Sequence, residues 1–113
     1  MHEQRHAEAT ADPAARKTDV VVETADIRIV EHTFEPGDTN PWHYHSEVSD
    51  RFYCLAGLIG VETRQPAERR VLQPGESCEI PARAVHHAYN AGIGTSRYLL
   101  IQALGKFDFV KVD

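Results

Sequence analysis

The chain has 113 residues, which is enough for one domain and too few for two separate hydrophobic cores. Hydrophobic residues make up 42% and charged residues 26% of it, the balance of a folded globular protein rather than a disordered one. A formal net charge of −5 argues against the broad positive surface that nucleic acid or an anionic membrane would attract, so we expect neither as a partner.

Residues 1–17 are rich in alanine, charge and histidine and contain no aromatic residue. Because such a segment buries little apolar area, we expect a flexible or frayed N-terminal tail, followed by a single domain over 18–113. We find neither the apolar centre of a signal peptide nor a stretch of membrane-spanning length. Cys54 and Cys78 are too few for a disulfide framework, so we predict a cytoplasmic protein with reduced thiols.

From Thr18 onward the sequence changes to short runs rich in β-branched and aromatic residues, separated by Gly, Pro, Asn and Asp. These runs predict ten strands, over 19–24, 26–34, 42–46, 50–55, 58–64, 69–73, 76–80, 84–90, 96–104 and 107–112. Ten short strands with turn residues between them are typical of a closed barrel or sandwich, which leaves few open sheet edges. The predicted fold class is therefore all-β.

Two histidines one residue apart, His43 and His45, point to the same face of their strand. If that face meets the faces of Asp50 and His86 inside a barrel, three imidazoles and one carboxylate converge. Such donors suit one divalent transition metal ion, with Fe, Mn, Ni, Cu and Zn all acceptable. Two alternatives stay open: the same residues form a hydrogen-bonded polar cluster without metal, or Glu47 replaces Asp50 as the carboxylate.

Two groups of residues keep the spacing of the two sequence motifs of the cupin family. The first motif is represented by Gly37, His43, His45, Asp50 and Gly57. The second is represented by Gly75, Pro81, His86 and Asn90. The chain from about Thr18 to Asp113 thus resembles a small single-domain cupin. The resemblance implies a double-stranded β-helix, or jelly-roll, barrel that holds a metal ion through the histidines and the acidic residue of these motifs.

Two positions depart from the family pattern. Asp50 stands where cupins usually have glutamate, and the loss of one methylene leaves open whether it binds the metal directly, through water or not at all. Arg83 replaces a glycine of the second motif, which argues against a positive φ at that turn and places a cation near the mouth of the barrel.

Four further residues are predicted to contact a small-molecule substrate: Phe52, Cys54, Asn90 and Gln102. For Cys54, a nearby metal would lower the thiol pKa, and the alternative is a small apolar filler. The two amides would bind substrate or a metal-bound water, or else tie down backbone. His32 is either a pocket-lining acid or base or a barrel histidine with satisfied hydrogen bonds, and we favour the second.

The outward-facing Tyr44, Tyr53 and Leu55 suggest an exposed patch and a homodimer, unless the N-terminal strand covers them. The resemblance implies a metal-dependent enzyme acting on a small oxygenated molecule, of the dioxygenase, isomerase or lyase type. No residue can be assigned as the catalytic base. The alternatives are a ligand-binding or sensor cupin that works with a partner protein, and a storage protein with an incidental metal.

Overall fold

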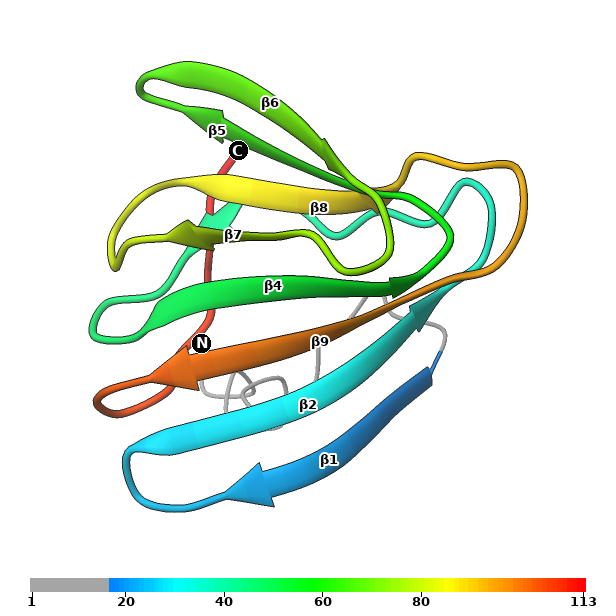
Figure 1. The fold of residues 1–113 in the computed structure, drawn as a ribbon. Coiled ribbons are helices and arrows are strands. Elements are labelled where there is room, and N and C mark those ends of the chain that lie inside the picture. Colours follow the sequence, from blue (N-terminus) through cyan, green and yellow to red (C-terminus); the bar gives the residue numbers. More distant parts are fainter. Residues whose placement is uncertain (1–16) are drawn as a thin grey trace.

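The computed structural model describes residues 17–113, and the predicted tail, apart from Lys17, lies outside this range. The described residues form ten strands, which pair antiparallel in two five-stranded sheets (Figure 1). In spatial order, the first sheet contains β1 (Lys17–Glu23), β2 (Ile27–Phe34), β9 (Ser96–Ala103), β4 (Ser49–Ala56) and β7 (Ser77–Ile80). The second contains β10 (Val110–Lys111), β3 (His43–Tyr44), β8 (His86–Asn90), β5 (Ile59–Arg64) and β6 (Ala67–Leu72).

Each of the ten predicted strands overlaps an observed strand, so the all-β prediction is confirmed. Two strands, β3 and β10, are much shorter than predicted, and side-chain hydrogen bonds to backbone join the segments beside them. The amide of Ser46 donates to the Asp108 carboxylate at 2.8 Å, for example. Residues 17–113 contain no helix of the length and apolar character needed to cross a membrane.

Burial alternates along the strands as a barrel with one inner face requires. In β2 every second residue is buried, beginning at Arg28 and ending at Phe34. In β4 the buried residues begin at Asp50, and in β8 they begin at His86. The inner face therefore carries charged and imidazole side chains at one end of several strands.

The register of the first sheet separates a polar row from an apolar row. Arg28 of β2 is opposite Gln102 of β9, which is in turn opposite Asp50 of β4. Two residues further along, a row begins with Val30 and ends with Phe52, and it belongs to the hydrophobic core. The core thus fills the barrel interior beside a polar layer at the ends of β2, β9 and β4.

The expected outward patch is divided between the two sheets. Tyr44 lies on β3 of the second sheet, whereas Tyr53 and Leu55 lie on β4 of the first. Both tyrosines are half-buried, and Leu55 is 40% exposed. The N-terminal strand β1 forms one edge of the first sheet and pairs with β2. Because β2 and β9 lie between β1 and β4, β1 is not a neighbour of the strand that carries Leu55. The three residues therefore do not form one patch, and the homodimer stays a prediction.

Gly60 in β5 lies directly opposite Tyr89 in β8, the strand that carries His86. A Cβ at Gly60 would lie 2.1 Å from Cζ of the Tyr89 ring, so the ring occupies the space that a side chain would need. We expect Gly60→Ala to lower the free energy of unfolding by about 1–3 kcal/mol through overpacking. Urea denaturation of the purified variant measures this change.

Gly94→Ala is the matched control, because an added Cβ there meets no atom within 4 Å. We expect this change to stay within about 0.5 kcal/mol of the unsubstituted protein. Equal unfolding free energies for the two variants would contradict the proposed contact between Gly60 and Tyr89.

Candidate metal centre

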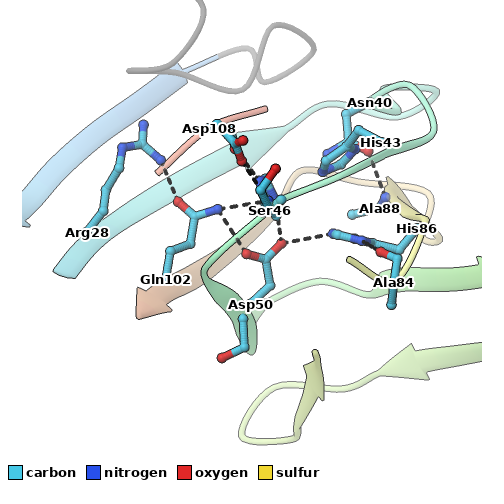
Figure 2. Close-up of polar contacts among 12 residues, drawn as sticks. Arg28, Asn40, His43, Ser46, Asp50, Ala84, His86, Ala88, Gln102 and Asp108 are labelled. Atoms are coloured by element: carbon cyan, nitrogen blue, oxygen red, sulfur yellow. Dashed lines mark hydrogen bonds and ion pairs between the residues drawn. The ribbon is translucent and has the colours of Figure 1, made fainter. Parts of the chain in front are cut away.

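Four buried residues gather at the polar end of the barrel: His43, His45, Asp50 and His86. One nitrogen or oxygen atom from each lies within 4.8 Å of the others. His43 comes from β3, Asp50 from β4 and His86 from β8, and His45 directly follows β3. The pairing of His43 with His86 across β3 and β8 holds two imidazoles side by side. The side chains therefore converge from both sheets, as the alternation of the strands predicted (Figure 2).

The Nδ1 atom of each imidazole in this cluster lies within hydrogen-bond distance of a backbone carbonyl. The three pairs are His43 with Pro41 at 2.7 Å, His45 with Asp108 at 2.5 Å and His86 with Ala84 at 2.8 Å. A carbonyl only accepts, so each Nδ1 carries the hydrogen that it donates. In a neutral ring the Nε2 atom then presents a lone pair to the cluster, which is how protein histidines are usually oriented for a metal.

The Asp50 carboxylate lies between two of these Nε2 atoms. Its Oδ2 is 3.0 Å from Nε2 of His45 and 2.9 Å from Nε2 of His86. Two lone pairs facing a carboxylate oxygen repel it unless a proton or a metal cation lies between them. Adjacent donors around an octahedral ion with bonds of about 2.1 Å are about 3.0 Å apart, so these two spacings are compatible with an ion as well as with hydrogen bonds. The shorter side chain of Asp50 thus reaches the other donors of the cluster, and its direct ligation of an ion stays a prediction.

Electrostatics favour a charged Asp50 despite its complete burial. Burial by itself disfavours the carboxylate, but without a metal the attraction of His45 and the hydrogen bonds shared with His45 and His86 hold the pKa of Asp50 well below its usual range. Burial also opposes a charge on His45, yet the carboxylate raises the pKa of that ring. Burial, His86 and His45 together lower the pKa of His43 to about 3, so the lone pair of its Nε2 stays available for a metal ion.

The amide of Gln102 connects Asp50 with Arg28. Its Nε2 donates to Oδ1 of Asp50 at 2.9 Å, and its Oε1 accepts from Nη1 of Arg28 at 2.8 Å (Figure 2). The register of β2, β9 and β4 places the three residues in one row, so the chain of contacts follows from strand pairing. Sequence analysis proposed Gln102 for this region and missed Arg28. The sequence signal for Arg28 was its even spacing from His32, which places both residues on the same face of the strand.

A small cavity adjoins the cluster, and two of the four predicted substrate contacts, Phe52 and Gln102, line it together with Leu100. The volume in which the centre of a water molecule fits is about 10 Å³, which is room for a single water. In this conformation the cavity has room for an ion or a water, and a larger ligand requires side chains to move.

Cys54 and Asn90 do not line this cavity, so their contact with substrate stays a prediction that the cavity does not support. The Cys54 thiol contacts the Gly57 carbonyl at 3.4 Å, and burial raises its pKa. The amide nitrogen of Asn90 donates to the carbonyls of Phe34 and Gly94 at 3.1 and 2.8 Å. Both residues share the inner face with the site but stabilise backbone further along the barrel.

His32 lines the cavity and is fully buried. Its Nδ1 lies 2.9 Å from the Thr18 hydroxyl, whereas its Nε2 has no hydrogen-bond partner among the described residues. The favoured prediction of a satisfied barrel histidine is therefore only half correct. Burial, aided by the charge of Arg28, lowers the pKa of His32 to about 3, so the ring is neutral near pH 7.

Residues 104–109, between β9 and β10, close the open end of the site. The Asp108 carbonyl accepts from Nδ1 of His45, and Phe109 stacks on His43 with ring centroids 4.0 Å apart. Phe107 lies 5.4 Å from the His45 ring, measured between centroids. Sequence analysis placed this Phe-Asp-Phe segment in a strand and missed its contribution. The alternating aromatic residues were its only signal.

The structure also shows where Glu47, the alternative carboxylate, and Arg83, the residue in place of a motif glycine, lie. Glu47 is exposed, and its carboxylate accepts from the Lys106 amide at 2.9 Å, so it does not replace Asp50. Arg83 adopts a φ of 72°, contrary to the expectation for a non-glycine residue. Its amide donates to the His45 carbonyl at 2.8 Å, and its exposed side chain does not line the cavity.

Comparison with known proteins identifies the class to which this fold and site belong. The family model described as a cupin domain matches residues 30–102, so the chain belongs to the cupin family. A curated relative, germin-like protein subfamily 1 member 4 of Arabidopsis thaliana, is 31% identical over 108 residues. The match covers 85% of this chain and 48% of that protein, so this chain spans about half the length of its relative.

Solved structures confirm the double-stranded β-helix. A conserved protein with this domain from Klebsiella pneumoniae has a TM-score of 0.74 at 21% identity, over 94% of this chain and 93% of that one. An oxalate oxidase, solved in complex with the substrate analogue glycolate, has a TM-score of 0.75 at 21% identity. That match covers 91% of this chain and 58% of the oxidase. At these identities the structures show the fold alone.

His32 generates a prediction about acid stability. Because its pKa is lowered from 6.5 to about 3 on folding, its neutral form favours the native state fully above pH 6.5. This contribution falls as the pH drops from about 6.5 toward 3, and about 2 kcal/mol of it is lost by pH 5. We expect His32→Gln to reduce the acid-induced loss of unfolding free energy by about this amount, measured by urea denaturation of metal-free protein at pH 7.5 and 5.0.

His87→Gln is the control, because His87 lies on the outer face and pairs with Glu62. An acid-induced loss that is the same for His32→Gln and the unsubstituted protein would show that His32 does not resist protonation in the fold.

Proposed function

We propose that this cupin is a mononuclear metal enzyme acting on a small oxygenated organic molecule. The observation that carries the proposal is the convergence of His43, His45, Asp50 and His86, with one donor atom of each within 4.8 Å of the others and every imidazole Nδ1 bonded to a backbone carbonyl. These four residues would hold the ion. The donor set accepts Fe, Mn, Ni, Cu or Zn, so the reaction type among dioxygenase, isomerase and lyase stays open.

A divalent ion bound by four protein donors supplies a Lewis acid with positions left for oxygen atoms of a substrate. The residues of the chain provide the environment. The carbonyl bonds fix the imidazole rings, and Gln102 holds Asp50 with one oxygen directed at two of them. Phe52 and Leu100 provide an apolar wall that limits water in the cavity. A small ligand would therefore bind with defined orientation.

Similarity to known cupins supports the class of ligand. The similar oxalate oxidase is described with glycolate as a substrate analogue, and both names denote small organic acids. We extend this only to the size and oxygen content of the expected substrate.

The first test is metal content in a pair of adjacent variants. His86 belongs to the cluster, while His87 points to the opposite face. We expect about one equivalent of a single transition metal in untagged full-length protein and in His87→Ala. His86→Ala should lose at least about tenfold in metal affinity, since one donor is gone. Plasma mass spectrometry of the dialysed proteins, with circular dichroism to verify folding, gives the result.

The same pair controls for metal held elsewhere, because both variants retain His2 and His6 of the N-terminal segment. Equal metal content in His86→Ala and His87→Ala would place the metal outside the cluster and refute the proposed centre. The absence of metal from all three proteins, after reconstitution with each candidate ion, would refute it as well.

Turnover distinguishes an enzyme from a ligand-binding or sensor cupin. We expect metal-loaded protein to convert at least one member of a panel of small hydroxy, keto and dicarboxylic acids, detected by mass spectrometry and oxygen uptake. The His86→Ala variant should reduce the rate at least about 100-fold, because the proposed chemistry depends on the bound ion. A ligand that binds tightly and is recovered unchanged would favour the sensor alternative instead.

We further propose a cytoplasmic location. Cys54 and Cys78 are both buried free thiols, the state expected in a reducing compartment.

A further inference from the structure

Arg28 is a buried cation beside the candidate metal centre. It is only 3% exposed and lines the same cavity as His43, His45 and Asp50. Of the described residues that line this cavity, only Arg28 and Asp50 are of the types Lys, Arg, Asp or Glu. A charge is costly to bury, so its contacts at the polar end of the barrel bear on what this cavity can bind.

The guanidinium of Arg28 is held in a defined position. Its Nη1 donates to Oε1 of Gln102 at 2.8 Å, and its central carbon lies 4.5 Å from the centroid of the Phe107 ring. Gln102 is fixed from the other side by Asp50, so the amide cannot rotate without breaking one of two bonds. The row from Arg28 to Asp50 therefore presents a cation and a potential metal ligand to one cavity (Figure 2).

Charge balance indicates what this cavity would bind. Of the described residues that line the cavity, Arg28 and Asp50 carry opposite charges, and a divalent ion would add two positive charges to this lining, which also includes Phe52 and Phe109. Charges interact strongly where water is excluded, and the site would favour an anion over a neutral ligand. A guanidinium also matches a carboxylate with two parallel hydrogen bonds.

We propose that Arg28 binds a carboxylate group of the substrate and thereby selects small organic acids over neutral alcohols, amides and sugars. This inference rests on the proposed metal-dependent function, because the other end of the acid would coordinate the ion. Arg28 is then a specificity-determining residue of the site.

Phe107 is one of the side chains that lie against the guanidinium of Arg28. This ring is half-buried and belongs to residues 104–109, which form no strand between β9 and β10. Because the cavity has room for a single water, an acid would displace Phe107 from the guanidinium. The cation–π contact would then be replaced by charge-assisted hydrogen bonds, which are the stronger interaction.

The test compares each acid with an uncharged counterpart in metal-loaded full-length protein. The probes are malonate and succinate, each paired with the half-amide in which one carboxylate becomes a neutral group, namely malonamate and succinamate. Calorimetric titration gives the affinities, and metal content is measured before and after each titration. We expect the protein to prefer at least one diacid over its half-amide by about tenfold or more.

The variant Arg28→Gln removes the charge and should reduce this preference to within about twofold. Arg97→Gln is the matched control, because Arg97 makes the same change in net charge while pairing with Glu31 on the outer face. It should keep the full preference. Circular dichroism verifies the fold of each variant, and Arg28→Lys provides a second variant if the glutamine leaves the barrel unfolded. The lysine keeps the charge without the planar fork, so we expect it to lose part of the preference.

Each outcome has a defined meaning. A metal-loaded protein that shows no preference for the acids, or keeps the preference in both Arg28 variants, overturns the role of Arg28 and leaves the metal centre intact. Binding of none of the four probes to metal-loaded protein also overturns it. Failure to bind metal overturns the proposed function instead, so the two hypotheses fail separately.

Discussion

The polar end of this barrel depends on the buried carboxylate of Asp50. One oxygen contacts the Nε2 atoms of His45 and His86, and the other accepts from Gln102. A charge that is 1% exposed persists there because these partners hold the pKa of Asp50 well below its usual range. The same carboxylate connects a possible cation site on one side with Arg28 on the other. Its environment is therefore central to both the proposed metal binding and the proposed preference for a charged ligand.

Three connecting segments hold the imidazoles in position. The carbonyls of Pro41, Ala84 and Asp108 each accept from one Nδ1, so the orientation of the rings is set by backbone rather than by other side chains. Backbone acceptors are available whatever the neighbouring residue type, which makes this arrangement robust to substitution. It also couples the site to residues 104–109, since movement of Asp108 would release the ring of His45.

The apolar row beneath the site has a separate function. Val30, Leu100 and Phe52 pack in the barrel interior next to the polar row and separate it from the rest of the core. Because the core excludes water from one side, the electrostatic contacts of Asp50 and Arg28 act in a medium of low polarity. Residues such as Cys54 and Asn90 lie about 13 Å further along their strands, given about 3.3 Å per residue, and take structural roles.

The sequence by itself determined which side chains share an inner face, because alternation along a strand is a local property with a period of two residues. Alternation predicted the cluster of His43, His45, Asp50 and His86, and runs of β-branched and aromatic residues predicted the ten strands. The cupin barrel was predicted from the resemblance of two spaced motifs to those of the family. Only the tertiary structure decided how deep each inward residue lies, because depth depends on register between strands distant in sequence. That register placed Arg28 opposite Gln102 and left Cys54 outside the cavity lining. The path of the chain between β9 and β10 placed Phe107 against Arg28.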